Sequence, residues 1–357
     1  MRPDVVVIGG GPAGCSTAIR LARTGMRVRL YEKSRFPRPK LCGGCLSAEA
    51  IPELADLGLL ELVKSAGAWP IHRVLLSSSN GVRANCDLSY PAFSISRDRL
   101  DTILLHHARA CGVEVFEGED GLPHADSARW TVMAKGRSAP TSQLFRDQPF
   151  YGIQAVYEGA PGITDQIELD MVPGGYFGLA RQEEGFVNVC GLVDQSTMRR
   201  AGSDLDSAMR AFAEANPLLG ERLRNARRIS AWLAVGPVMR GQRRLAEGNT
   251  FYVGDAACVV DPFVGEGMAM GLATGRILRN AFQEAPEAPA KVYERLWHKQ
   301  FDSSRRLQTT ICWAIEKPWW QELLAHSCRT FPALMRWLTD NTRPYANIQS
   351  DPNLNAV

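Results

Sequence analysis

The segment DVVVIGGGPAG, residues 4–14, is the strongest indication of the fold because it joins a β-branched run directly to a glycine-rich turn. Residues 5–8 have the composition of a buried parallel strand, and residues 12–22 have the composition of a helix. Gly25 stands where a left-handed helix cap belongs, and residues 27–31 predict a second strand. The order strand, turn, helix, strand predicts a βαβ unit.

The glycines of this turn follow the spacing Gly9-x-Gly11-x-x-Gly14, which is typical of dinucleotide-binding loops. Gly9 permits the tight turn, Gly11 lets the backbone approach a pyrophosphate, and Gly14 lets helix and strand pack closely. Glu32 ends the second strand, where an acidic side chain holds ribose hydroxyls. A glycine-rich turn without a ligand is the alternative, but strand, helix and acid together favour dinucleotide binding. The predicted contacts are Gly9, Gly11, Pro12, Ala13, Gly14, Glu32 and Lys33.

A second motif lies late in the chain, as Gly254-Asp255-Ala256-Ala257 followed by residues 261–267, DPFVGEG. It resembles the second fingerprint of the flavoprotein hydroxylase and geranylgeranyl reductase superfamily. The resemblance implies that Asp255 holds ribityl hydroxyls of FAD, and that the helix beginning at Gly267 directs its positive end toward the flavin ring. A strand-to-helix loop without a ligand is the alternative. The residues that the resemblance assigns to FAD here are Gly254, Asp255, Pro262, Gly265, Gly267 and Met268.

Residues 35–47, RFPRPKLCGGCLS, look like the Cys-Gly-Gly stretch of geranylgeranyl-reductase-like flavoproteins, and residues 96–101, SRDRLD, look like their arginine segment. The matches together span most of the chain. They imply that Arg97 contacts the phosphates or adenosine of FAD, and that Cys42, Gly43 and Gly44 lie near the flavin ring. An equally favoured interpretation is that Cys42 and Cys45 are simply two buried thiols.

A redox pair formed by Cys42 and Cys45 is disfavoured. Flavin disulfide reductases use a wider cysteine spacing and carry a second Gly-x-Gly-x-x-Gly domain for the nicotinamide cofactor, and this sequence has no second copy. We therefore expect NADPH to act as a transient reductant without a domain of its own.

The order of patterns along the chain predicts a discontinuous first domain. Alternating runs between residues 153 and 193 indicate an antiparallel sheet, and the strand-to-glycine pattern returns at residue 250. The fold class is therefore α/β, with a Rossmann-like FAD-binding domain, an inserted antiparallel-sheet substrate domain and a helical C-terminal tail. By resemblance it is para-hydroxybenzoate-hydroxylase-like. The predicted segments are 1–147 and 247–288 for the FAD-binding domain, 148–246 for the substrate domain and 289–357 for the tail.

The chain departs from the family pattern at the substrate sheet. Lipid-reducing members usually show Pro-x-x-Tyr-x-Trp-x-Phe, whereas here Pro173 and Tyr176 are followed by Gly178 and Ala180. These two positions would leave extra room over the flavin for a bulky, flat or aromatic substrate, although backbone packing explains Gly178 equally well. The Ala-Asp-Gly motif of the family is replaced by residues 134–137, AKGR, after a segment that looks shortened.

Composition excludes several classes of protein. An apolar fraction of 45% and a charged fraction of 22% are those of a packed globular chain, which excludes a mainly disordered one. A net charge of +3 without long runs of one sign predicts no nucleic-acid partner, and the sequence specifies no oligomeric state. Nine scattered cysteines fit free thiols in the cytoplasm, and no apolar run is long enough to predict a transmembrane helix.

The tail is rich in tryptophan and has two interpretations. Its indoles either pack helices onto the substrate domain or form an apolar entrance with transient membrane contact. The histidines show no metal-ligand spacing, so we expect no metal site. The tryptophans concerned are Trp297, Trp313, Trp319, Trp320 and Trp337.

The sequence therefore predicts an FAD-dependent oxidoreductase that acts on a small apolar or aromatic substrate. In the leading mechanism, hydride passes from the flavin to a carbon–carbon double bond in an isoprenoid- or polyketide-like substrate. The alternatives are a monooxygenase that hydroxylates an aromatic or polyketide-like ring, and a non-catalytic lipid carrier on the same fold. The candidates near the flavin are Cys42, Tyr176 and Glu266, and none of them is assigned as the catalytic acid.

Overall fold

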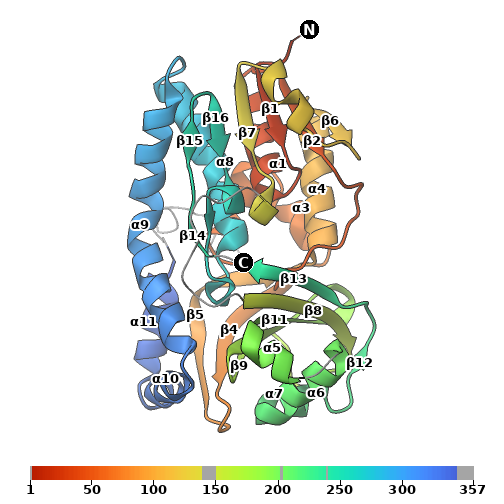
Figure 1. The fold of residues 1–357 in the computed structure, drawn as a ribbon, viewed down its shortest axis with the longest axis vertical. Coiled ribbons are helices and arrows are strands. Elements are labelled where there is room, and N and C mark those ends of the chain that lie inside the picture. The colour runs from red at the N-terminus through yellow and green to blue at the C-terminus, as the bar shows by residue number, and fades with distance from the viewer. Residues whose placement is uncertain (1, 139–149, 202–203, 239, 344–357) are drawn as a thin grey trace.

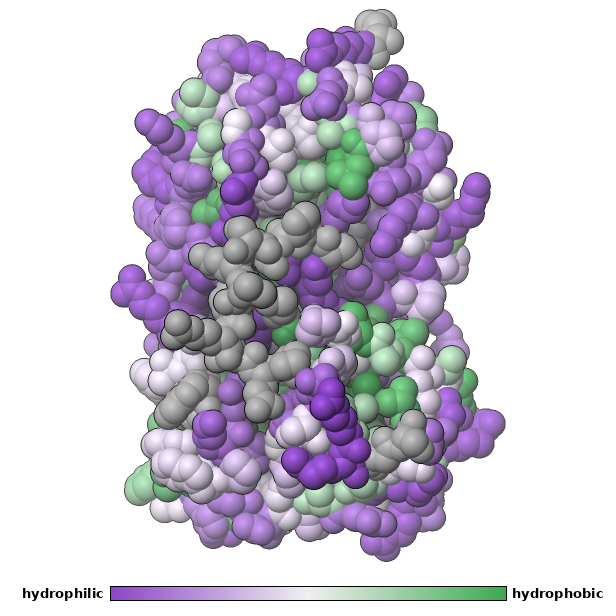
Figure 2. Space-filling view, in the orientation of Figure 1, coloured by the Kyte–Doolittle hydropathy of each residue, from purple (hydrophilic) through white to green (hydrophobic). Residues whose placement is uncertain are grey.

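The computed structural model describes residues 2–138, 150–201, 204–238 and 240–343 (Figure 1). A parallel sheet with its helices forms the upper half of the view, and a larger sheet forms the lower half. The predicted domain boundary between residues 147 and 148 lies outside the described residues. The face in Figure 2 is mostly hydrophilic over the upper half, and hydrophobic residues gather below its middle, over β13 (Leu233–Val238).

The upper sheet has six strands and is parallel except at one edge. The predicted βαβ unit is present, because β1 and β2 pair in parallel with Val5 opposite Val28. Strand β1 lies inside the sheet, between β7 and β2, and all four of its residues are buried. A strand that is covered on both faces has no exposed side, which explains its run of apolar residues. In sheet order the strands are β15 (Ala246–Glu247), β16 (Thr250–Tyr252), β7 (Trp130–Met133), β1 (Val5–Ile8), β2 (Val28–Glu32) and β6 (Glu114–Glu117).

Helices from both ends of the chain pack together beside this sheet. The side chain of Ser16 in α1 donates a hydrogen bond of 2.6 Å to the carbonyl of Leu272 in α8. A Cβ on Gly275 would lie 2.5 Å from the Ser16 hydroxyl oxygen, so α1 and α8 cross closely. Residues from the early and the late motif regions are therefore in direct contact. The helices here are α1 (Pro12–Ala22), α2 (Ala50–Asp56), α3 (Leu60–Ser65), α4 (Arg97–Ala110) and α8 (Gly267–Glu284).

The lower sheet has nine strands and is antiparallel except where β4 runs parallel to β9. The antiparallel sheet predicted from the middle of the chain is confirmed in β8 to β11. Strands β3, β4 and β5 join it from the first third of the chain, which the sequence analysis did not predict. Its strands are β12 (Arg227–Arg228), β8 (Phe150–Glu158), β11 (Val187–Asp194), β10 (Gly175–Arg181), β9 (Gln166–Val172), β4 (Trp69–Ser77), β5 (Arg83–Ser94), β3 (Cys45–Leu46) and β13. A separate pair joins β14 (Gly241–Gln242) to β17 (Cys258–Val259).

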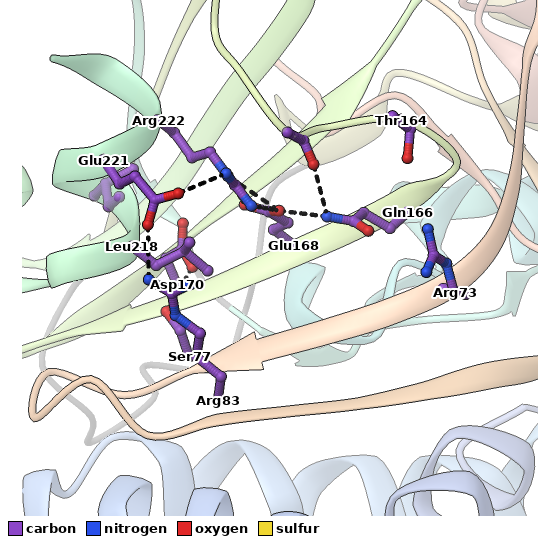
Figure 3. Close-up of polar contacts among 12 residues, drawn as sticks. Arg73, Ser77, Arg83, Thr164, Gln166, Glu168, Asp170, Leu218, Glu221 and Arg222 are labelled. Carbon is purple, nitrogen blue, oxygen red and sulfur yellow. Dashed lines mark hydrogen bonds and ion pairs between the residues drawn. The ribbon is translucent and has the colours of Figure 1, made fainter.

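A buried ion pair ties a helix to this sheet (Figure 3). The guanidinium of Arg222 donates to both carboxylate oxygens of Glu168, with Nη2 at 2.8 Å from Oε1, and Gln166 donates to the same oxygen at 2.6 Å. The hydroxyl of Ser77 donates to the neighbouring buried Asp170 at 2.6 Å. Because an unpaired charge inside the protein is costly, these contacts define how the helices lie on the sheet. The helices on this face are α5 (Gln195–Ala201), α6 (Leu205–Ala215) and α7 (Pro217–Leu223).

The tail is helical, as predicted, and consists of α9 (Pro289–Ile315), α10 (Pro318–Thr330) and α11 (Pro332–Asn341). Trp297 is fully buried, but in the core of the upper half rather than on the substrate domain, and the packing interpretation is wrong for Trp319 and Trp337, which are 62% and 51% exposed. The side chain of Trp313 lies outside the described part of the chain. Among the described helices, none is long and apolar enough to cross a bilayer.

Candidate functional site

One cavity of about 510 Å³ lies between the two sheets and draws its walls from both halves of the molecule and from the tail. Its upper wall contains the first glycine loop, with Gly9 at a φ of 113°, a conformation that favours glycine. A Cβ on Gly9 would lie 2.4 Å from the carbonyl oxygen of Ala134, so no side chain fits there. The cavity is the candidate cofactor and substrate site.

The first loop presents the amino end of α1 to the cavity. Gly11 caps this helix without a side-chain hydrogen bond, Pro12 begins it, and its first turn carries no acidic residue. The free N–H groups and the helix dipole therefore favour an anion at this point. Gly14 does not line the cavity; a Cβ there would lie 1.8 Å from the Gly9 carbonyl oxygen, so Gly14 serves the packing of helix and strand.

Glu32 lines the cavity and also holds the loop in shape. Its carboxylate accepts hydrogen bonds from the N–H groups of Gly10 at 2.7 Å and Ser34 at 2.9 Å. Lys33 lines the cavity beside it. The buried carboxylate of Glu32 therefore borders the cavity, and its ribose-binding role stays a prediction.

Basic side chains gather at this end of the cavity. Arg97 makes two hydrogen bonds of 2.8 Å to the buried carboxylate of Asp101, from Nε and Nη2, one turn further along α4. Burial lowers the pKa of Arg97, but the charge of Asp101 more than offsets this and the pKa is raised. Burial and the charges of Arg137, Arg97 and Arg38 lower the pKa of Lys40. So many cations around one space suit the two phosphates of a dinucleotide.

The second motif reaches the same cavity. Gly254 and Asp255 line it in the short turn after β16, and Gly254 has a φ of 58°. A Cβ on Gly254 would lie 2.7 Å from the Cβ of Ala13, so the two motifs touch. Asp255 and Glu32 therefore share one cavity, as binding of a single FAD requires. The other predicted contacts that line it are Pro262, Gly265, Gly267 and Met268.

Glu266 lies outside the lining of this cavity, although its neighbours on both sides belong to it. It is fully buried behind the start of α8, where one carboxylate oxygen lies 3.2 Å from Nε of Arg343. Burial raises its pKa well above the usual value, and the nearby carboxylate of Glu49 raises it further. Glu266 therefore contacts Arg343, which does line the cavity, and does not line the cavity itself.

The loop that carries Cys42 and Gly43 also lines the cavity, and the side chains of two residues hold it in place. The Cys42 N–H donates to Gln154 at 2.8 Å, and the Cys42 carbonyl accepts from Asn188 at 3.0 Å. Gln154 and Asn188 bond each other at 2.7 Å. Sequence reasoning missed this pair, for which polar residues in otherwise apolar strands are the only local signal.

The cysteine chemistry of this loop is limited. All nine cysteines of the chain are free thiols, so the structure contains no disulfide between Cys42 and Cys45. Burial raises the pKa of Cys45 to about 12, which keeps that thiol protonated and unreactive at neutral pH. Across the described residues, no group of three His, Cys, Asp or Glu side chains is arranged to hold a metal ion.

The floor of the cavity is the apolar face of the lower sheet. Tyr176 lies on β10 with its ring edge-on to Phe263 at 5.0 Å, and its buried hydroxyl has no hydrogen-bond partner among the described residues. Gly178 lines the cavity, and a Cβ there would meet nothing closer than 3.6 Å, as the prediction of extra room requires. Ala180 does not line it, so that half of the prediction is wrong. The segment 134–137 does line it.

The tail supplies a further wall that the sequence did not reveal. Ile311, Leu324, Met335 and Leu338 face the cavity from α9, α10 and α11, opposite Leu76 and Leu169 of the sheet. Cys328, Thr339 and Thr342 also line it. One end of the cavity is therefore basic and made of loops, and the other is apolar and closed by helices.

Known proteins are similar to this chain, either over its first part or over most of its length. Residues 2–143 match the family model described as an FAD binding domain. Menaquinone reductase of Mycobacterium tuberculosis is 29% identical over 352 residues, which cover 85% of this chain and 83% of the relative. Digeranylgeranylglycerophospholipid reductase 2 of Methanopyrus kandleri is 27% identical and covers 84% of this chain and 83% of its own. A solved flavoprotein/dehydrogenase of Cytophaga hutchinsonii has the same fold, with a TM-score of 0.81, 18% identity and coverage of 99% and 95%.

Proposed function

Because this chain is an FAD-dependent oxidoreductase of the flavoprotein hydroxylase-like superfamily, we propose that it reduces a carbon–carbon double bond in an apolar, isoprenoid- or polyketide-like substrate. One observation carries the proposal: the basic, loop-built end and the apolar, helix-closed end belong to a single cavity. The names of the two long relatives, menaquinone reductase and digeranylgeranylglycerophospholipid reductase 2, support it.

The loop-built end fits FAD. The amino end of α1, Arg97 and Lys40 would hold the phosphates, and Glu32 and Asp255 would hold the ribose and ribityl hydroxyls. Bound FAD supplies the two-electron, hydride-transferring chemistry that no side chain of this protein can supply. The residues Pro262, Gly265 and Gly267 would lie against the ring.

The apolar end excludes water and orients the substrate. Leu76 and Leu169 from the sheet and Leu324 and Met335 from the tail form a surface that suits a hydrocarbon chain. Tyr176 is our candidate proton donor, because its hydroxyl is buried without a partner. Burial, followed by the charge of Asp261, raises its pKa well above the ordinary value, so the phenol keeps its proton until substrate arrives.

We propose NADPH as a transient electron donor and the cytoplasm as the location. The sequence has only one Gly-x-Gly-x-x-Gly loop, so NADPH would bind without a dedicated domain. Free thiols at every cysteine agree with a reducing compartment.

The test is product analysis with purified holoprotein under nitrogen. We would supply NADPH and a short, soluble polyprenyl compound, and follow product mass and NADPH oxidation together. We expect a gain of two hydrogens for each NADPH consumed, with free FAD and NADPH lacking the protein as the blank. Holoprotein that binds FAD and oxidises NADPH but leaves every double bond intact would disprove the reductase proposal.

Oxygenation is the second candidate function, and the open space above Gly178 favours it. The same reaction in air distinguishes the two. A product that gains one oxygen atom, with oxygen consumed in step with NADPH, would establish a monooxygenase in place of a reductase.

A further inference from the structure

Four of the seven large hydrophobic side chains exposed on the described structure belong to the segment 319–337, which comprises α10, the residue after it and α11. They are Trp319 at 62% exposure, Leu323 at 47%, Phe331 at 64% and Trp337 at 51%, which together we call the tryptophan face. Phe331 stands at the junction, since it follows the last residue of α10 and precedes the first of α11. Leaving this much aromatic surface in water is unfavourable, and such patches mark interaction sites.

The exposed charged residues of the segment 317–342 are of one sign. Lys317, Arg329 and Arg336 are exposed, and none of the exposed residues among 317–342 is acidic. The acidic side chains of these helices are half-buried and accept hydrogen bonds from other elements. Glu322 accepts from the hydroxyl of Ser78 at 2.8 Å and from the N–H of Asn80 at 3.2 Å, and Asp340 accepts from Ser89 at 2.8 Å. The tertiary contacts therefore leave an aromatic and cationic outer surface.

The inner surface of the same two helices is part of the substrate cavity. Leu324 and Cys328 of α10 and Met335 and Leu338 of α11 line it. Only one layer of helix separates the exposed tryptophan face from the apolar end of the site. Figure 1 shows α10 and α11 at the lower left, beside β5.

We propose that the tryptophan face docks on an anionic lipid bilayer and that α10 and α11 are the side through which an apolar chain passes from the bilayer into the cavity. Tryptophan and phenylalanine prefer the boundary between headgroups and acyl chains, and arginine and lysine attract anionic headgroups. With 13 and 10 residues, these helices are too short to cross a membrane, so they lie on it. The inference deepens the proposed function and rests on it for the identity of the substrate as a membrane lipid.

The test is co-sedimentation of holoprotein with substrate-free vesicles, either of phosphatidylcholine alone or of phosphatidylcholine with phosphatidylglycerol. We expect binding to the anionic vesicles that weakens with salt. The double variant Phe331→Ser, Trp337→Ser should lower the partition coefficient by about tenfold. The double variant Arg329→Gln, Arg336→Gln should remove the preference for anionic vesicles.

The matched control is Leu62→Ser with Leu122→Ser, because these leucines are exposed to a similar extent, 50% and 45%, but lie on other elements. The control should bind vesicles as the unmodified protein does. Equal binding of all variants, or no binding to either vesicle, would overturn the proposal. So would a change from dimer to monomer in the Phe331, Trp337 variant with unchanged vesicle binding, because the face would then contact a second copy of the chain.

The assay separates this inference from the proposed function. Reduction of the soluble polyprenyl compound without vesicle binding would leave the function standing and remove the docking surface. Vesicle binding without reduction would leave the docking surface standing and disprove the proposed function.

Discussion

Gly254 and Ala13 are in direct contact across the two cofactor loops, since a Cβ on Gly254 would lie 2.7 Å from that of Ala13. These residues belong to distant parts of the chain, so the contact joins the two loops that line the cavity. Its closeness also leaves no room for a methyl group.

The variant Gly254→Ala should therefore lose FAD. The added methyl would push the two loops apart, and alanine would be strained at a φ of 58°. We expect purified Gly254→Ala to retain less than about a tenth of the FAD bound by the unmodified protein, measured by absorbance. Gly112→Ala is the control, because its φ of 84° is also positive, whereas open space surrounds it and it has no part in the cavity. FAD loss in both variants would mean that strain alone is responsible.

Replacement of Arg97 by methionine should weaken FAD binding. The guanidinium lines the cavity in a geometry held by Asp101, and charge-assisted hydrogen bonds contribute about 1.5–3 kcal/mol each, so affinity should fall by roughly 10- to 100-fold. Quenching of FAD fluorescence on titration of the apoprotein measures this. Arg99→Met is the control, because Arg99 lies on the same helix and pairs instead with Glu183 and Glu184. Equal loss in both variants would contradict a specific role for Arg97.

Tyr176→Phe should slow turnover and leave FAD in place. The phenylalanine keeps the edge-on contact with Phe263 and removes only the hydroxyl, which has no partner among the described residues. If the phenol donates the proton, the rate of reduction should fall about 10²- to 10⁴-fold, with unchanged FAD content and thermal midpoint. Because burial raises the pKa of Tyr176 well above 10, the unmodified protein should show no loss of rate from this group up to pH 10. An unchanged rate in the variant would remove Tyr176 from the mechanism.

Asp170 should make stability fall as pH rises. Burial, followed by the charge of Glu168, raises its pKa in the folded protein to about 7, from 3.8 in the unfolded chain. The folded state therefore binds the proton more tightly, and this contribution is full below about pH 4 and is lost as pH rises through about 7.

Asp170→Asn keeps an oxygen that accepts from Ser77 and removes the ionisation. Its stability relative to the unmodified protein should increase between pH 4 and 8 by about 2–4 kcal/mol, measured by urea unfolding at each pH. Asp165→Asn is the control, because the pKa of that exposed group is lowered by its hydrogen bond to Arg73. A constant difference between Asp170→Asn and the unmodified protein would show that Asp170 is already ionised in the folded state.

The cofactor-binding end of the cavity was largely predictable from the sequence. Gly9, Gly11 and Glu32 were predicted from their spacing, because backbone approach to a pyrophosphate and the turn from strand to helix are local requirements, and Asp255 was predicted from the resemblance of its motif to a known fingerprint. The helical tail and the antiparallel sheet were likewise predicted from the periodicity of short segments.

The surroundings of the apolar end of the cavity depend on long-range contacts and could not be predicted from local sequence. The hydrogen bond between Gln154 and Asn188, the turning of Glu266 toward Arg343 and the pairing of β4 with β9 join residues that are far apart in the chain. The division of α10 and α11 into a cavity-lining side and an exposed tryptophan face depends on which neighbours each helix meets. Helical periodicity shows that a segment has two faces, but packing against a distant sheet selects the one that is buried.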